Sequence, residues 1–324
     1  MLLCGLPLLR ARAAAQSEAD PASWSTRPAL RVLLGTGVTE AGSGGTFLFN
    51  GRAYRGTYQQ LADGQIVNLV DLEAYLSSVV SREMPAGWAA AALQAQAICA
   101  RSYVLWRSDP RRQYDLVPSE LDQVYEGISA ETPSGVGAVD STTGAVLWFG
   151  GGYAQVAYSS CCGGHTESAA DAWGKAAPPY LGGVACGWCT GSPKYRWTTT
   201  LEFDAVAAAL ASSFPQLGRI TDLRIGDRDA SGRVRDFQVA SDRGSVVVGG
   251  SAFRRAVGSR VLPSLLLTAA QVTPGASGVL VTGGGLGHGV GLCQWGARGM
   301  ALAQRSAWDI LALYFPGTVV KNLS

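Results

Sequence analysis

The stretch that decides the fold covers residues 81–105 and reads SREMPAGWAAAALQAQAICARSYVL. Its alanine-rich part favours a helix from Trp88 to about Arg107, because alanine loses no side-chain entropy in a helix. Pro85 suits the first turn of this helix, where a missing backbone N–H costs nothing. An apolar stripe recurs at Leu93, Ala97, Ala100 and Val104. We therefore expect this helix to pack closely at the centre of the fold.

Upstream of this helix, the hydrophobic pattern predicts short strands and one more helix. Strands separated by glycine-rich turns are expected at 30–35 and 45–54, and a hairpin with a turn at Asp63-Gly64-Gln65 is expected within 54–70. From Asp71 the apolar residues recur at helical spacing. This change predicts a short amphipathic helix that ends near residue 81.

Downstream, the residue pattern changes from about 195 to 267, where short runs of strand-forming residues alternate with turn sequences. This pattern predicts a strand-rich lobe. The expected elements are a strand at 197–201, a helix at 204–214, strands between 220 and 248, and a short helix at 251–257. Helices and strands interleave without a regular βαβ rhythm. We therefore predict an α+β fold with mainly antiparallel sheets, in which the central alanine-rich helix and the flanking lobe border a groove.

A second informative run, GHGVGLCQWG, occupies residues 287–296 and carries one of the two histidines of the chain. Its glycines indicate a backbone that turns or approaches something closely, and we expect a ligand there. His288, Gln294 and Trp295 suit a sugar, which offers hydroxyls at its rim and C–H groups on its faces. The alternative is a glycine-rich hairpin whose histidine makes its hydrogen bonds within the fold and binds no ligand.

Glu83 is the carboxylate of greatest interest, because it precedes a proline-opened helix at a point where its side chain can face a cleft. The alternative is an acidic residue that is merely favoured by the dipole of that helix. A hydrolase with two acids would need a second carboxylate. The candidates for that role are Asp122, Glu126, Glu167 and Asp171, and their spacing selects none of them.

Two short cysteine motifs predict a metal site. Cys162 and His165 are separated by two residues, as are Cys186 and Cys189, and such knuckles deliver pairs of ligands to a tetrahedral zinc. Four protein ligands would close the coordination sphere, so we expect a structural zinc. Cys161 competes with Cys162 as a ligand. A disulfide between residues 161–162 and 186–189 is the alternative in an exported chain.

Composition and charge limit the classes of protein to which this chain can belong. The 324 residues are 47% hydrophobic, which is enough to bury a full core, and no run of about 20 uncharged apolar residues predicts a membrane span in the mature chain. Residues 1–15 resemble the apolar end of a secretion signal, and residues 16–29 have the polar character of a tether before a main domain at 30–324. We therefore expect export to the cell envelope or beyond.

The charge balance argues against a nucleic-acid partner. The chain has 26 lysines and arginines and 24 acidic residues, and loss of Arg10 and Arg12 with the signal leaves the two signs equal. A nucleic-acid-binding protein would show a basic excess or patch.

Three motifs in this order resemble the SpoIID/LytB family of bacterial cell-wall proteins. They are the runs at 81–105, at 157–167 (AYSSCCGGHTE) and at 287–301, with YFPGT at 314–318 closing the pattern. The resemblance covers roughly residues 30–320. Gln94 replaces a lysine that is usual in the family, and Cys293-Gln294-Trp295 replaces the commoner Ser-Gln-Tyr, which keeps an aromatic face.

The resemblance implies a lytic transglycosylase that cleaves peptidoglycan glycan strands, and it maps the catalytic acid onto Glu83. Such an enzyme breaks the bond after N-acetylmuramic acid and closes a 1,6-anhydro ring. The substrate-binding candidates are Tyr158, Ser159, Ser160, Gln96, His288, Gln294 and Trp295. In a strand, residues 158–160 could instead merely alternate between faces.

One carboxyl suffices for this reaction, because the sugar's own 6-hydroxyl is the nucleophile. Glu83 must then begin protonated, which burial against Met84 and Trp88 favours and a neighbouring helix N-terminus opposes. Two other functions remain open. Some relatives resemble non-enzymatic enhancers of a cell-wall amidase, and a zinc hydrolase of wall peptides would use His165 and the cysteines as catalytic groups.

Overall fold

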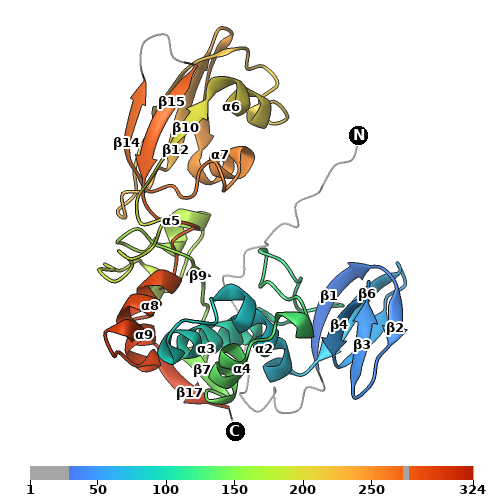
Figure 1. The fold of residues 1–324 in the computed structure, drawn as a ribbon. Helices are drawn as coiled ribbons and strands as arrows, with labels where there is room; N and C mark the ends of the chain where they lie inside the picture. Colours follow the sequence, from blue (N-terminus) through green and yellow to red (C-terminus); the bar gives the residue numbers. More distant parts are fainter. Residues whose placement is uncertain (1–28, 273–276, 324) are drawn as a thin grey trace.

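The computed structural model describes residues 29–272 and 277–323, which form two large hydrophobic cores and one small cluster around Trp148. The larger core joins the helices to the N-terminal strands, and the smaller core fills a separate lobe built from residues 197–283 (Figure 1). The predicted signal at 1–15 and nearly all of the predicted tether at 16–29 lie outside the described residues. No helix in the described ranges combines the length and the apolar character needed to cross a membrane.

Two small antiparallel sheets open the chain. The first has the order β1-β6-β5, and the second has the order β2-β3-β4. Their strands are β1 (Leu30–Thr36), β2 (Thr39–Ala41), β3 (Thr46–Phe49), β4 (Arg52–Arg55), β5 (Thr57–Gln60) and β6 (Gln65–Val70). The expected hairpin between β5 and β6 is confirmed. The single strand expected at 45–54 is wrong, because Asn50 and Gly51 both adopt positive φ and make a tight turn between β3 and β4.

The alanine-rich helix α3 (Ala90–Arg107) lies at the centre of the larger core, as expected. It follows α2 (Leu72–Glu83), whose first turn is capped by the Asp71 side chain. The expected helix start at Pro85 is wrong, since residues 84–89 form a loop and α3 begins only at Ala90. Glu83 therefore ends one helix and does not open the next.

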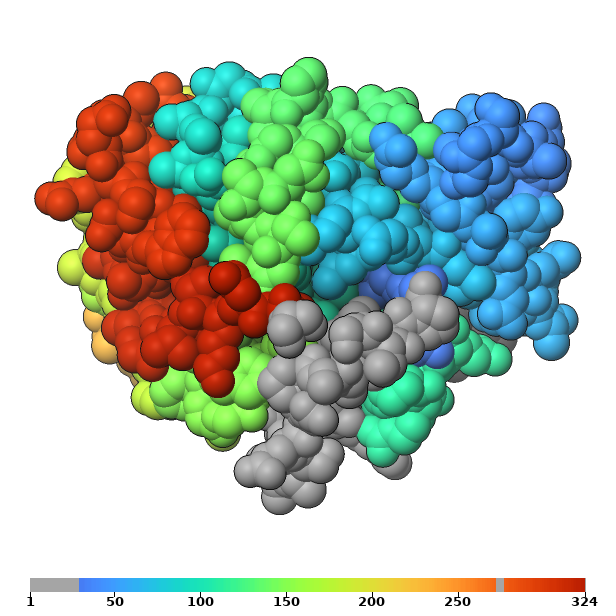
Figure 2. All heavy atoms as spheres, turned by 90° about the horizontal axis from the view of Figure 1, so that it is seen from below, coloured from blue at the N-terminus to red at the C-terminus, as the bar shows by residue number. Residues whose placement is uncertain are grey.

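Segments from the middle and the end of the chain pack around α3. They are α4 (Pro133–Asp140), β7 (Ala145–Phe149), β8 (Gly152–Tyr153), α8 (Gln294–Leu302) and α9 (Ala307–Tyr314), and β17 (Val319–Asn322) pairs with β7. The three-stranded sheet β17-β7-β8 joins the C-terminus to the middle of the chain. In Figure 2 the C-terminal segment (red) accordingly lies against residues of the middle of the chain (green). Shorter elements complete this part: η1 (Ile128–Ala130), α5 (Ala169–Trp173) and η2 (Pro179–Leu181).

The lobe consists of two antiparallel sheets and two helices. The sheets are β10-β15-β14 and β11-β12-β13. Their elements are β10 (Trp197–Glu202), α6 (Phe203–Leu210), β11 (Ile220–Ile225), β12 (Asp236–Ser241), β13 (Gly244–Gly249), α7 (Gly250–Val257), β14 (Leu267–Val272) and β15 (Gly278–Gly283). The lobe thus extends beyond residue 267, because β14 and β15 complete the sheet begun by β10. This mixture of helices and mainly antiparallel sheets confirms the α+β class.

Candidate functional site

A short parallel strand pair brings two distant motifs together. Strand β9 (Tyr158–Ser159) pairs with β16 (Leu292–Cys293), with Tyr158 opposite Leu292. The pairing continues on both sides: the Leu292 N–H donates to the Ala157 carbonyl (2.9 Å), and the Trp295 N–H donates to the Ser160 carbonyl (3.0 Å). The predicted site residues at 158–160 therefore lie directly beside the glycine-rich run.

The glycines of that run serve this approach. Gly291 has φ +72°, and a Cβ there would collide with the Ala157 carbonyl, while a Cβ at Gly289 would collide with the Arg233 guanidinium. A residue with a side chain would push the strands apart. We expected the glycines to admit a ligand, but at these two positions they admit other parts of the chain.

Glu83 is held at the end of α2 with its carboxyl partly buried. The Val124 N–H donates to its Oε1 (3.1 Å). Burial raises the pKa of Glu83, and the Val124 N–H and the nearby Tyr158 hydroxyl offset part of that rise. The negative end of the α2 dipole also disfavours the carboxylate here. The opposing helix N-terminus expected from the sequence is absent from this position, because α3 begins at Ala90.

Gln294 ties Glu83 to the central helix. Its Nε2 donates to the Glu83 backbone carbonyl (3.3 Å) and to Oε1 of Gln96 (3.4 Å). Gln96 is fully buried on α3. Three predicted site residues, from α2, α3 and α8, therefore meet at one point.

Several of the predicted site residues carry buried polar atoms with unmet hydrogen-bonding capacity. Within the described residues, Gln96 Nε2, the Tyr158 hydroxyl and Ser159 Oγ are buried and lack a hydrogen bond of normal geometry. A buried donor or acceptor without a partner costs about 1–3 kcal/mol. Such atoms are therefore candidates for binding a polar ligand.

His288 lies against Tyr158, the residue whose hydroxyl also acts on Glu83, and both of its ring nitrogens are engaged. Its Nδ1 accepts from the Val290 N–H (3.0 Å), and its other nitrogen faces the Tyr158 backbone carbonyl. Burial lowers the pKa of His288 to about 4, so the ring is neutral near pH 7. The ring also lies near Trp173, with 5.8 Å between ring centroids. This geometry matches the alternative of a histidine whose hydrogen bonds are made within the fold. The ring then helps to position the strand that carries Tyr158.

The four carboxylates considered for a two-acid hydrolase are all engaged by arginines. The pairs are Asp122–Arg107 (3.4 Å), Glu126–Arg82 (3.0 Å), Glu167–Arg233 (3.5 Å) and Asp171–Arg235 (2.5 Å). Within the part of the chain that the structure describes, Glu83 has no lysine or arginine at ion-pairing distance. Burial also raises the pKa of Glu167 in spite of its arginine, so Glu83 differs from the four in lacking an arginine partner among the described residues.

Four cysteines converge beneath the site. The sulfurs of Cys162, Cys186, Cys189 and Cys293 all lie within 4.8 Å of one another, and all four residues are buried. The Cys162 and Cys189 sulfurs are 3.7 Å apart. A tetrahedral zinc with Zn–S bonds of about 2.3 Å requires sulfurs roughly 3.8 Å apart, whereas a disulfide requires about 2.05 Å. The donor set therefore fits a closed tetrahedral zinc.

Backbone groups also support the sulfurs. The Cys293 sulfur accepts from the Cys162 N–H (3.2 Å) and from the Gly296 N–H (3.3 Å), and Cys186 contacts the Tyr314 hydroxyl (3.1 Å). Cys293 caps α8, one residue before Gln294. The cluster thus fastens the start of the helix that carries Gln294 and Trp295.

His165 does not join this cluster. Its Nδ1 donates to the Thr166 carbonyl (2.7 Å), and Cys293 supplies the fourth converging group in its place. Cys161 is not one of the four mutually close sulfurs, although its thiol interacts with Cys189 and Cys293 and its backbone bridges to Leu286. The set predicted from the two short motifs thus shares three of its four members with the cluster in the structure.

Sequence reasoning missed two members of the site, Cys293 and Val124. Cys293 lies 104 residues after Cys189, so no local spacing reveals it, although it occupies the glycine-rich run that we had singled out. Val124 contributes only its backbone N–H, which no side-chain pattern can report.

Comparisons with known proteins agree with the three motifs. A family model described as Stage II sporulation protein matches residues 61–149, and a domain of unknown function (DUF8618) matches residues 189–291, which include most of the lobe. Stage II sporulation protein D of Bacillus subtilis is 30% identical over 280 residues, which cover 80% of this chain and 76% of that protein.

Two further relatives extend the comparison. An uncharacterized protein of Brachyspira hyodysenteriae is 32% identical over 277 residues, covering 84% of this chain and 73% of its own length. The amidase enhancer of Bacillus subtilis is 28% identical over 293 residues, which cover 76% of this chain but only 40% of that protein. The resemblance read from the motifs is confirmed, and the chain belongs to the SpoIID/LytB family, which includes stage II sporulation protein D.

Proposed function

We propose that this protein cleaves the glycan strands of peptidoglycan by a lytic transglycosylase reaction at the cell envelope, with Glu83 as the single general acid and base. The observation that carries the proposal is the environment of Glu83. Its carboxyl has a raised pKa and no arginine partner among the described residues, it interacts with the Tyr158 hydroxyl, and Gln294 links its backbone to Gln96, whose buried Nε2 lacks a hydrogen bond. The sporulation and amidase-enhancer relatives support a role in the cell wall.

The geometry suits a proton transfer through one oxygen of the carboxyl. Because the Val124 N–H occupies Oε1, the proton is carried by Oε2. Glu83 donates that proton to the glycosidic oxygen as the bond breaks and then accepts a proton from the 6-hydroxyl as this hydroxyl closes the 1,6-anhydro ring. No water is consumed, and both steps use the same side chain.

The intramolecular attack explains why a second carboxylate is unnecessary. A hydrolase needs a second acid as a nucleophile or to activate water. Here the nucleophile belongs to the substrate, and correct orientation of such a group is worth about 7–11 kcal/mol at best. The residues that orient the sugar are then Gln96, Tyr158 and Ser159, through their buried polar atoms, and Trp295, through its ring.

We further propose that Cys162, Cys186, Cys189 and Cys293 hold a structural zinc. Bound there, the ion supplies folding free energy and no open coordination position, because four thiolates complete a tetrahedral sphere. A closed sphere also argues against the zinc hydrolase considered from the sequence. The cysteines fasten β9 to the start of α8, and so maintain the spacing between Tyr158 and Gln294.

The competing function is a non-enzymatic glycan-binding protein that enhances an amidase, which the amidase-enhancer relative favours. The variant Glu83→Gln distinguishes the two functions, because it preserves the shape of the side chain but removes the proton that the acid transfers. We expect the variant to lose cleavage of purified glycan strands by about 10²–10⁴-fold. An enhancer would keep its effect on the amidase in the same variant.

Product analysis by mass spectrometry completes the test. Anhydro-muramyl ends indicate lytic cleavage, reducing ends indicate hydrolysis, and free stem peptides indicate amidase action. Anhydro ends formed at an unchanged rate by Glu83→Gln would rule out Glu83 as the acid. An unchanged melting temperature in the variant is the control for folding.

A further inference from the structure

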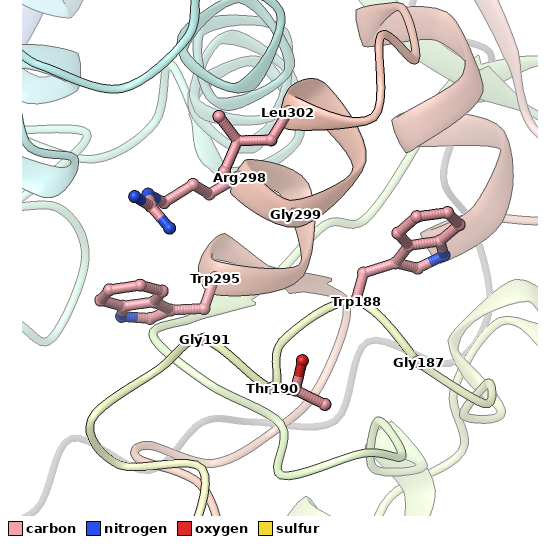
Figure 3. A pocket seen from close by; sticks show the side chains of 8 residues that line it. All are labelled: Gly187, Trp188, Thr190, Gly191, Trp295, Arg298, Gly299 and Leu302. Carbon is pink, nitrogen blue, oxygen red and sulfur yellow. The ribbon is translucent and has the colours of Figure 1, made fainter.

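A pocket of about 260 Å³ opens beside helix α8 and combines aromatic rings with one cation (Figure 3). Its walls include Trp295, Arg298 and Leu302 from α8, and residues 187, 188, 190 and 191 on either side of Cys189, among which Trp188 is exposed. In Figure 3 Trp295 and Arg298 point to one side of the helix, and Trp188 lies on the other. The volume suits a sugar ring or a substituent of one.

The Arg298 guanidinium lies within cation–π distance of two indoles. Its Cζ lies 5.0 Å from the ring centroid of Trp295 and 5.8 Å from that of Trp88. The two indoles also contact each other edge to face at 5.1 Å. These contacts hold the cation against the rings, and its N–H groups can still bind a planar acceptor.

No acceptor for those N–H groups is present within residues 29–272 and 277–323. Other arginines with low exposure do have one: Arg101 pairs with Glu73, Arg31 with Asp115 and Arg233 with Glu167. None of the residues that line the pocket is acidic. A partly buried cation with unused donors therefore faces the pocket, and a ligand with negative charge complements it.

The pocket adjoins the proposed catalytic residue. Arg298 follows Gln294 by four residues on α8, so both project from one face of that helix. Gln294 holds the Glu83 carbonyl, and Trp88 lies in the loop that directly follows Glu83. A sugar stacked on Trp295 would therefore have its substituents within reach of Arg298 while its chain passes Glu83.

We propose that Arg298 binds a carboxylate carried by the glycan and so makes this site selective for muramic acid over N-acetylglucosamine. The inference rests on the proposed function and names a specificity-determining residue for it. Muramic acid carries a lactyl carboxylate that N-acetylglucosamine lacks. A stem peptide converts that group into an amide but adds carboxylates of its own. Both sources present the planar acceptor that a guanidinium binds through two hydrogen bonds.

Binding to the Glu83→Gln protein tests the proposal without turnover. Three ligands are compared by calorimetry: a tetrasaccharide with free lactyl carboxylates, the same saccharide carrying stem peptides, and chitotetraose, which has no carboxylate. In this background Arg298→Gln should weaken binding of at least one carboxylate ligand about tenfold or more. Chitotetraose should bind the variant within about twofold of its parent.

The matched control is Arg305→Gln, which removes an exposed arginine after the same helix without touching the pocket. It should leave all three affinities unchanged. Arg298→Lys keeps the charge but loses the planar fork, so it should fall between the parent and Arg298→Gln. This milder variant keeps the test valid if Arg298→Gln fails to fold.

The outcomes separate the two sources and the two proposals. A loss confined to the free saccharide identifies the lactyl carboxylate, and a loss confined to the peptide-bearing ligand identifies a peptide carboxylate. Equal losses for chitotetraose and the carboxylate ligands, or no loss for any, would overturn the role of Arg298. Cleavage by Glu83→Gln would instead refute the catalytic proposal and leave this binding result intact.

Discussion

Gln294 donates its side-chain amide to the backbone carbonyl of Glu83, across 211 residues of sequence and a distance of 3.3 Å. Because the contact is made to the backbone, the Glu83 carboxyl remains available for proton transfer. The same amide reaches Gln96 on the central helix (3.4 Å). Gln294 therefore fixes the end of α2 relative to α3 and α8, and in the proposed reaction its role is to position Glu83.

We expect Gln294→Leu to slow glycan cleavage by about 10–100-fold while the melting temperature changes little, because a shift of about 1 Å in a catalytic group can cost 10² in rate. Steady-state rates and thermal unfolding of the same preparations measure both effects. Gln94→Leu is the control, since Gln94 bonds to Ser141 on another side of α3. A wild-type rate for Gln294→Leu would show that the contact does not position Glu83.

The pH dependence of cleavage should report the raised pKa of Glu83. A general acid must begin protonated, so the rate should fall as the pH rises through that pKa, which lies above the usual value for glutamate. The Tyr158 hydroxyl lowers the pKa of Glu83. Tyr158→Phe should therefore raise it and move the descending limb of the profile to higher pH.

A second buried tyrosine provides the control for that shift. Tyr180 packs on Phe149, with ring centroids 4.7 Å apart, and does not contact Glu83. Tyr180→Phe should leave the midpoint of the descending limb where it is. A shift to lower pH in Tyr158→Phe, or equal shifts in both variants, would contradict the assignment of the limb to Glu83.

The zinc proposal predicts different outcomes for two single substitutions. Cys293→Ser should reduce bound zinc well below one ion per chain and lower the melting temperature, because a structural zinc contributes folding free energy directly. His165→Ala should retain the metal, since its imidazole bonds to Thr166 and lies outside the four sulfurs. Elemental analysis and thermal unfolding measure the two effects.

Cys99→Ala controls for loss of a buried thiol, because Cys99 lies in the core of α3 away from the cluster. Zinc lost by His165→Ala and kept by Cys293→Ser would restore the ligand set read from the two short motifs. Protein free of metal, with no free thiols among residues 162, 186, 189 and 293, would favour disulfides instead.

Local pattern predicted most of the elements correctly. The alanine run 90–107 forms the central helix because its propensity and its burial agree. The lobe strands alternate as half-buried strands should, as in β12. The pattern failed at two turns: Asn50-Gly51 splits an expected strand, and Pro85 lies in a loop that begins at residue 84. Both errors concern single residues that outweigh the average propensity of their neighbours.

The site was harder to predict than the fold because its contacts are distant in sequence. Glu83, Gln96 and Gln294 could each be chosen by residue type, but only the fold brings them within hydrogen-bond distance. The same holds for Cys293, which joins two knuckles across more than 100 residues. A backbone donor such as the Val124 N–H leaves no signal in the sequence at all.

Glu167 links the lobe to the larger core and should make stability depend on pH. Its carboxylate accepts from the Ser231 hydroxyl (2.8 Å) and from the Ser168 N–H (2.8 Å), and it pairs with Arg233, which also donates to the Cys162 carbonyl (2.8 Å). Glu167 and Arg233 are both about 2–3% exposed. Burial outweighs these partners and raises the pKa of Glu167 to about 7.

Because the folded-state pKa lies above the unfolded value of about 4.3, the folded protein binds this proton more tightly. The resulting stability is fully present below the unfolded pKa and is lost as the pH rises through about 7. We expect the free energy of unfolding to fall between pH 5 and pH 8 by on the order of 2–3 kcal/mol at most from this group. Urea unfolding should show a flatter dependence for Glu167→Gln, which cannot titrate, and an unaltered one for Glu126→Gln, whose ion pair with Arg82 is exposed. Wild-type stability that rises with pH relative to Glu167→Gln over this window would show that the carboxylate is stabilised, and not destabilised, by its burial.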